Sequence, residues 1–397
     1  MHITLDNMFA FLVLLLILVT FMGYIIPTAY LSFTITREHQ LEEVAQAIMD
    51  KVLLSPGIPE NWGDILVVED SSKLYAFGLQ KAGGEPYELD MDKVLRIVNT
   101  GVGQLPETVQ IDPGTIARLL GIENKYGLSI RMMPALNLTA TPLAYFDLKG
   151  GVMVPSVIKA NVKTPEGRPA ISANVTGIYV LMVIQKEGNE DVCYLDYIDR
   201  TSIVDTDGYA TLDFTDFLQD AKSRVGNLQR SFSAAIIYAD YYGIRSVNSS
   251  LLGETDILEG STVDDYLIVR FPEGGPYIPG ARHLKNQTAL ANPPYYIYLS
   301  KLLNETTGES GMVINRGAKD YRVYRVSNTI DENVAFIMMP VKYLGRYYVV
   351  NFRRPPSIVI CQIGAASGNI KTSVLRRMVR IGSFHYVFEV RVWRWGE

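Results

Sequence analysis

The residues in this sequence best suited to chemistry are five asparagines in Asn-x-Ser/Thr sequons. They are Asn137, Asn174, Asn248, Asn286 and Asn304. Such an asparagine accepts an N-linked glycan where it lies on the surface of an extracytoplasmic domain. Together the five sequons predict that the body of the protein lies outside the cell.

Cysteine is scarce, with only Cys193 and Cys361 in the chain. In an oxidising compartment the two thiols could form a disulfide between the second and third parts of the body. Two free, buried thiols are an equally good interpretation, because unpaired cysteine behaves as a small apolar residue.

The remaining motifs do not predict catalysis. The four histidines, among them His385, show no metal-ligand spacing. Residues 205–208 (DTDG) lack the further oxygen ligands of a calcium loop and are typical of a hairpin turn. Residues 272–280 (PEGGPYIPG) lack the Lys-Ser/Thr of a phosphate-binding loop. We therefore predict no catalytic residue, no metal site and no cofactor, and the protein is not expected to be an enzyme.

Composition narrows the class of protein further. The chain has 397 residues, 48% hydrophobic and 20% charged, with a formal net charge of −5. This composition is typical of a folded chain of two or three domains rather than of a disordered one. A net negative charge argues against nucleic acid as a partner.

The N-terminal segment predicts a membrane anchor. No charged residue occurs between Asp6 and Arg37, and Phe9 to Tyr24 is almost wholly apolar. About 20 apolar helical residues cross a bilayer, so a span from Met8 to Ile35 is long enough to contact the lipid throughout. The alternative, a cleaved signal peptide, is disfavoured because the leader has no Lys or Arg and no clear cleavage site follows.

The predicted location is the cell membrane, with a single pass, the N-terminus inside and the C-terminal body extracytoplasmic. Pro27 is expected to kink the helix. Beyond it, Leu41, Val44, Ile48 and Val52 follow helical spacing, which predicts an amphipathic continuation. One rod from Met8 to Leu54 would be about 70 Å long.

The body is predicted to be mainly β, as β-sandwich ectodomains that follow the long transmembrane and amphipathic helix. We expect four parts: the helix over 1–57, a mixed α/β head segment over 58–150, an immunoglobulin-like sandwich over 151–260 and a β-rich domain over 261–397. Short helices should begin after Asp90 and after Asp112, where an N-cap residue precedes a helical pattern.

The strands of the last two parts follow from alternating patterns and turn residues. Residues 154–164 and 171–184 are strand-like runs separated by the turn PEGRP, and hairpins are expected at Leu344-Gly345 and Gly382-Ser383. In the final strand the apolar residues should share one face, opposite His385, Glu389 and Arg391.

Two surface features are suited to partners. Tyrosine, 24 residues in all, clusters in segments such as YADYYG, where it could serve adhesion or simply pair across strands. The last 27 residues hold six basic and two acidic residues, which could face anionic lipid or an acidic partner, or form a solvated strand face.

The order of these features resembles archaeal type IV pilin-like and related membrane-anchored surface proteins. The tract from Phe9 to Tyr24, the helix to Leu54 and the segments 117–130 and 379–395 carry the resemblance. Separately, VKTPEGRPAISANVT and VDTDGYATLDF resemble immunoglobulin-like modules related to carboxypeptidase regulatory domains. The leader MHITLDN departs from pilin precursors, because it lacks basic residues and a small residue at the junction.

These observations predict a membrane-anchored surface protein that acts in binding or assembly. Its expected partners are the bilayer, like subunits, and surface-layer proteins or glycans. The alternatives are a minor or tip subunit of a pilus-like filament and, from another class, an ectoenzyme of unknown reaction.

Overall fold

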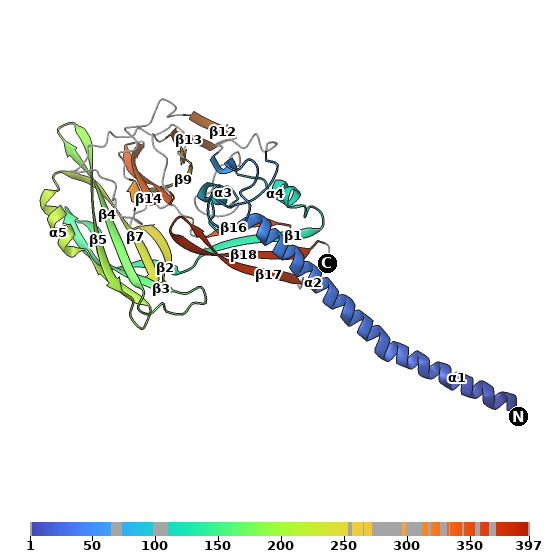
Figure 1. Cartoon of the computed structure of the whole chain (residues 1–397). Helices are drawn as coiled ribbons and strands as arrows, with labels where there is room; N and C mark the ends of the chain where they lie inside the picture. Colours follow the sequence, from blue (N-terminus) through green and yellow to red (C-terminus); the bar gives the residue numbers. More distant parts are fainter. Residues whose placement is uncertain are drawn as a thin grey trace.

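The structure is a computed structural model. It describes residues 2–64, 74–97, 110–252, 256–264, 266–271, 296–298, 312–316, 319–325, 332, 334–343, 345–353, 358–364 and 371–395. In Figure 1 a long N-terminal helix projects from one end of a β-rich body.

The helices are α1 His2–Thr20, the π-turn η1 Phe21–Ile25, α2 Ile26–Leu53, the short 3-10 helix η2 Trp62–Asp64, α3 Met91–Arg96, α4 Pro113–Leu120 and α5 Thr215–Arg224. The strands up to the sandwich end are β1 Tyr126–Pro134, β2 Asn137–Lys149, β3 Val152–Lys163, β4 Asn174–Glu187, β5 Glu190–Ile203, β6 Tyr209–Asp213, β7 Leu228–Tyr241 and β8 Ile244–Leu251. The later strands are β9 Ile257–Val263, β10 Tyr266–Phe271, β11 Tyr296–Tyr298, β12 Met312–Arg316, β13 Lys319–Arg325, β14 Val334–Tyr343, β15 Arg346–Arg353, β16 Val359–Ile363, β17 Thr372–Ile381 and β18 Phe384–Arg394.

The N-terminal helix is continuous from His2 to Leu53, with a π-turn at Phe21–Ile25. Proline has no amide hydrogen, so Pro27 leaves the carbonyl one turn earlier, at Gly23, without its usual α-helical partner. The π-turn lies at this point and lets the helix continue. The predicted continuous rod is confirmed.

The first sheet joins distant parts of the chain. Its order is β16-β1-β18-β17, and β1 pairs with β18 from Tyr126 opposite Arg394 to Pro134 opposite Tyr386. The end of α2 packs against β17 and β18 (Figure 1). The expected head segment and the C-terminal strands therefore build one sheet, and Pro134 lies at the end of an interior strand rather than on an edge.

A sandwich of two antiparallel sheets forms the far end of the body (Figure 1). One sheet has the order β2-β3-β6, the other has the order β5-β4-β7-β8, and α5 lies against β2 and β3. A core that includes Tyr179, Leu212 and Phe214 fills the space between them. Because β2 pairs with β3, the chain enters the sandwich at Asn137, before the expected boundary at 151.

The central strands of the four-stranded sheet, β4 and β7, are buried on both faces. Along β4, Val175 and Tyr179 face the three-stranded sheet, whereas Ile178 and Val180 belong to the core shared with α2 and β18. A strand covered on both sides has a nearly continuous apolar sequence, as residues 178–184 have. This second burial fastens the sandwich to the head.

A seven-stranded mixed sheet completes the body. Its order is β11-β14-β15-β9-β10-β13-β12, with parallel pairs at β11/β14 and β15/β9. β14 and β15 pair up to Tyr343 opposite Arg346, as the hairpin predicted at Leu344-Gly345 requires, although Leu344 itself lies outside the described residues. The hairpin predicted at Gly382-Ser383 joins β17 to β18. The prediction of a mainly β protein is confirmed.

Candidate functional site: the helix, its clamp and a lateral cavity

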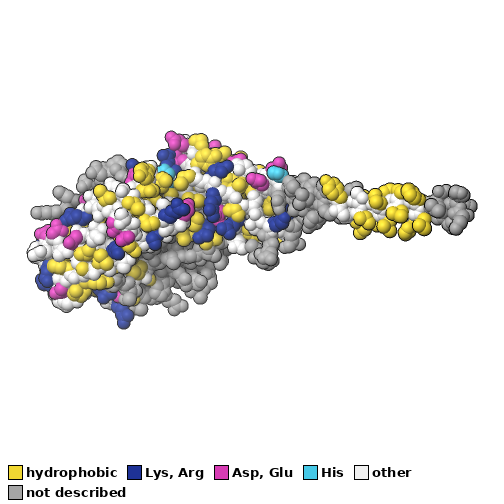
Figure 2. Space-filling model, turned by 90° about the horizontal axis from the view of Figure 1, so that it is seen from below, with side chains coloured by type: hydrophobic (Ala, Val, Ile, Leu, Met, Phe, Trp, Pro, Cys, Tyr) yellow, Lys and Arg dark blue, Asp and Glu magenta, His cyan; other side chains and the backbone are white. Residues whose placement is uncertain are grey.

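The most unusual surface is the apolar shaft, which we define as Met8–Tyr24. Every residue in it is exposed, and the exposed fraction of its large apolar side chains runs from 48% for Val13 to 72% for Tyr24. The Thr20 hydroxyl donates to the Leu16 carbonyl at 2.8 Å, so its polarity is satisfied within the helix. Figure 2 shows the shaft as a hydrophobic rod beyond the body. Such a helix, apolar all round, is the kind that proteins bury in a core or in lipid.

No helix within the described part of the chain is both long enough and apolar enough to cross a membrane. A bilayer span from Met8 to Ile35 therefore stays a prediction.

The docked half of the helix, Leu41–Leu53, has the predicted amphipathic pattern. Leu41, Ile48 and Val52 are buried against the head and Val44 is half-buried. Two arginines of the C-terminal hairpin contact its polar edge: Arg377 donates to Gln46 at 3.4 Å, and Arg394 donates to Gln40 at 3.1 Å. The basic hairpin is thus partly engaged by the helix itself.

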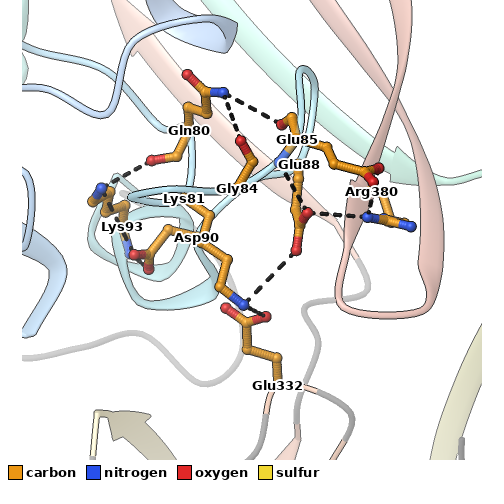
Figure 3. Close-up of polar contacts among 9 residues, drawn as sticks. All are labelled: Gln80, Lys81, Gly84, Glu85, Glu88, Asp90, Lys93, Glu332 and Arg380. Carbon is orange, nitrogen blue, oxygen red and sulfur yellow. Dashed lines mark hydrogen bonds and ion pairs between the residues drawn. The ribbon is translucent and has the colours of Figure 1, made fainter.

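An ionic network holds the segment after the helix to the C-terminal hairpin (Figure 3). Glu88 lies 3.0 Å from Arg380 of β17 and 3.7 Å from Lys81, and Lys81 reaches Glu332 at 2.7 Å. The backbone adds to it, because Leu89 N–H donates to the Arg380 carbonyl and Arg380 N–H donates to that of Tyr87. Burial opposes ionisation of Glu88, but hydrogen bonds and the Arg380 charge outweigh it and lower its pKa.

Lys93 lies fully buried at the centre of this segment (Figure 3). Its Nζ donates to the carbonyls of Pro56 at 3.0 Å and Gln80 at 2.9 Å, and lies 3.7 Å from Asp90. Burial lowers the pKa of Lys93, which in a cleft would indicate a nucleophile. Here the ammonium group hydrogen-bonds two backbone carbonyls from different parts of the chain. These contacts indicate a structural role for Lys93. Asp90 also caps α3, as predicted.

The outer face of the first sheet carries a cross-strand charge cluster. Glu389 of β18 is 1% exposed and accepts from Arg376 and Arg391, each at 2.7 Å. We predicted that Glu389 lies on the face opposite the apolar residues, and it does, but the two guanidinium groups bury it. Burial raises its pKa, yet the two arginines outweigh burial and lower it.

A cavity of about 350 Å³ lies where the sandwich meets the C-terminal hairpin. Its lining combines a buried aromatic floor with a polar rim: Asn174, Thr176, Tyr238, Ala239, Asp240, Arg245, Ser246 and Phe384. Tyr238 and Phe384 stack with ring centroids 6.1 Å apart, and Arg245 pairs with Asp240 at 2.9 Å. Small-molecule sites usually measure about 300–1,000 Å³, so the cavity is large enough for one small ligand.

His385 closes the wall beside this cavity. It is half-buried, and its Nδ1 accepts from the backbone N–H of Arg245 at 3.1 Å. The sequence places His385 on the polar face of the final strand, but the structure packs this part of the face against β8, and burial there lowers the pKa of His385. The alternating pattern of β18 could not reveal that another sheet covers part of its polar face.

The predicted sequons differ in accessibility. Asn137 and Asn174 are exposed at the first residues of β2 and β4. Asn248 is half-buried in β8, and its Nδ2 donates to the Leu138 carbonyl at 2.6 Å. Asn286 and Asn304 lie outside the described residues.

The two cysteines are free and buried on different sheets, Cys193 in β5 and Cys361 in β16. Burial raises the pKa of each thiol to about 12. This matches the second of the two interpretations, a pair of apolar core residues.

The 205–208 motif is a turn. The Asp205 carboxylate accepts from the backbone N–H groups of Asp207 and Tyr209, and Gly208 adopts a positive φ of 90°. Among the described residues, no group of three or more His, Cys, Asp or Glu side chains is placed to hold a metal ion.

The cavity was not anticipated from the sequence, although two signals for it existed. Asn174 and Thr176 are two residues apart in a strand and so share a face. The tyrosine cluster YADYYG supplies Tyr238 and Asp240 from the neighbouring strand. Comparison with known proteins adds no assignment: no protein-family model matches this chain, and no curated protein matches it in sequence.

Proposed function

We propose that this protein is a membrane-anchored surface protein whose extracytoplasmic body acts in binding or cell-surface assembly. The observation that carries the proposal is the exposed apolar shaft, Met8–Tyr24, on the same helix that docks into the head at Leu41–Leu53. Exposure of so much apolar surface to water is unfavourable, at about 25 cal/mol per Å². Lipid, or like helices, would remove that cost.

The proposed topology is a single pass with the N-terminus inside. The five sequons favour this side for the body, since two of the three described ones are exposed at strand ends. We also infer an immunoglobulin-like relationship for the sandwich. Its support is a core between antiparallel sheets of three and four strands, the strand number of the simplest immunoglobulin-like fold.

Membrane extraction together with surface labelling tests this proposal. The native protein should stay with membranes after a high-salt, alkaline wash and dissolve in detergent. A membrane-impermeant amine reagent applied to intact cells should label exposed lysines of the sandwich, such as Lys149. Release by the wash would contradict the anchor, and labelling only after lysis would reverse the topology.

The second candidate is a minor or tip subunit of a pilus-like filament. In its favour, an apolar helix exposed all round could pack with like helices in a filament core as well as with lipid. The mass of the N-terminal peptide from native cells separates the two proposals. A start at Met1 or His2 supports the permanent anchor, and a start just before the apolar tract supports the filament.

A further inference from the structure

The cavity between sandwich and hairpin has a sequon on its rim. Asn174 and Thr176, the two recognised positions of the Asn-Val-Thr triplet, both line it. Val175, between them, points into the sandwich core. The alternation of the strand therefore places the glycan acceptor and the cavity on one face.

The register of the sheet defines the surroundings of Asn174. Across the four strands, Ile203, Asn174, Asp240 and Arg245 form one row. The next row on the same face brings Thr201, Thr176 and Tyr238 together. A group attached to Asn174 would thus meet an exposed apolar side chain on one side, Ile203 at 69%, and the Asp240–Arg245 pair on the other.

This mixture suits a sugar ring. Aromatic and aliphatic side chains pack against its C–H faces, and a carboxylate beside a guanidinium supplies an acceptor and donors for its hydroxyls. Asp240 is held in place, because it accepts from the Gly243 N–H at 2.9 Å as well as from Arg245. The Arg245 backbone is fixed in turn by its bond to His385.

We propose that this cavity seats the first sugar residue of an N-linked glycan carried by Asn174. The inference rests on the proposed extracytoplasmic location. The linkage forms between Nδ2 of Asn174 and the anomeric carbon of an oligosaccharide carried on a lipid phosphate or diphosphate. The anomeric C–O bond breaks, the lipid phosphate leaves, and the proton lost from the amide goes to solvent.

The other described sequons provide internal controls. Asn137 is exposed like Asn174 but lies on the three-stranded sheet, outside the cavity. A glycan on Asn137 should extend freely into solvent. The Asn248 amide nitrogen is engaged with the Leu138 carbonyl, so we expect Asn248 to stay unmodified.

Periodate oxidation of the full-length protein from native cells tests the proposal. Periodate cleaves vicinal diols of sugars, and peptide mass spectrometry reports the oxidation at each asparagine. Pocketed ligands bury about 70–90% of their surface, so oxidation of the Asn174-linked sugar should be roughly three- to tenfold slower in folded than in unfolded protein. The Asn137-linked sugar should react equally fast in both states.

A variant outside the sequon sharpens this test. Arg245→Ala removes an exposed side chain from the cavity rim and leaves Asn174-Val175-Thr176 unchanged. It should raise the folded-state oxidation rate at Asn174 toward the unfolded rate, with no change at Asn137. Equal rates in folded and unfolded wild-type protein would overturn the proposal, as would an unmodified Asn174 beside a glycosylated Asn137.

The failure of the proposed location would look different. In that case no sequon would carry a glycan, and the membrane-impermeant amine reagent would not label this protein on intact cells. Glycan-free protein that is labelled on intact cells would overturn the seated glycan alone and leave the location standing.

Discussion

The two halves of the N-terminal helix share one backbone and differ in the faces they bury. In the apolar shaft every side chain is exposed, whereas the docked half hides Leu41, Ile48 and Val52 and leaves Glu42 and Ala47 in water. A helix with an apolar stripe on one side packs that side against one particular surface of the protein. A helix that is apolar on all sides has no such preferred side and needs only an apolar environment around it. We therefore expect the docked half to stabilise the fold of the head, and the shaft to determine whether the protein enters an apolar environment.

The largest expected effect comes from a cavity in the docked half. Met49 is fully buried, and Met49→Ala should lower the free energy of unfolding by about 2–5 kcal/mol. Leu16→Ala, in the exposed shaft, should leave it unchanged. Denaturant titration of the detergent-solubilised chain measures both. Equal losses would mean that the shaft also belongs to the folded core.

A charge in the shaft should change membrane association, whereas the same charge in the docked half should not. Lys at the centre of a membrane helix costs about 2.5–3.5 kcal/mol, so Leu16→Lys should shift the protein from the membrane to the soluble fraction. Ala47→Lys is the matched control, because Ala47 is exposed in the docked half. Membrane retention of Leu16→Lys equal to wild type would remove the distinction between the halves.

The sheet beneath the docked half provides a third test. Glu389→Gln keeps the size of a buried side chain but leaves Arg376 and Arg391 without their carboxylate. Loss of a buried charged partner should cost about 1–3 kcal/mol of unfolding free energy, measured by denaturation. Glu43→Gln, on the exposed side of the helix, is the control. An unchanged Glu389→Gln would show that the cluster contributes nothing to the base on which the helix rests.

Local features of this fold could be predicted from the sequence because their causes are local. The caps at Asp90 and Asp112 and the turn at 205–208 depend on residues within one turn of each other. The rod to Leu53 and the apolar face of β18 follow from periodicity alone.

The long-range arrangement could not be predicted in this way. The residue pattern of β1 does not indicate which strands pair with it, and its neighbours β16 and β18 follow more than 200 residues later. The domain boundary expected at 150 therefore divides this sheet. The burial of β4 on both faces depends on the same assembly. The cavity could not be predicted either, because its lining residues come from β4, β7, β8 and, with Phe384, from the distant strand β18.

The smallest expected effect concerns the contact that joins head and sandwich, and it depends on pH. Burial lowers the pKa of His385 below its usual 6.5, and the nearby charges of Arg380 and Arg245 act in the same direction, against Asp240. Between the folded pKa and 6.5 the unfolded chain binds more protons than the folded one, so stability rises with pH across this window and falls on acidification.

Protonation at Nδ1 would remove the acceptor for the Arg245 N–H, a bond worth about 0.5–1.5 kcal/mol. His385→Gln retains an acceptor that does not titrate, so its unfolding free energy should vary less between pH 7 and pH 5 than that of wild type. The difference should be at most about 1 kcal/mol, because the ring is only half-buried. If both proteins lose the same stability, His385 does not titrate with unfolding, and its bond to Arg245 contributes nothing to the pH dependence of stability.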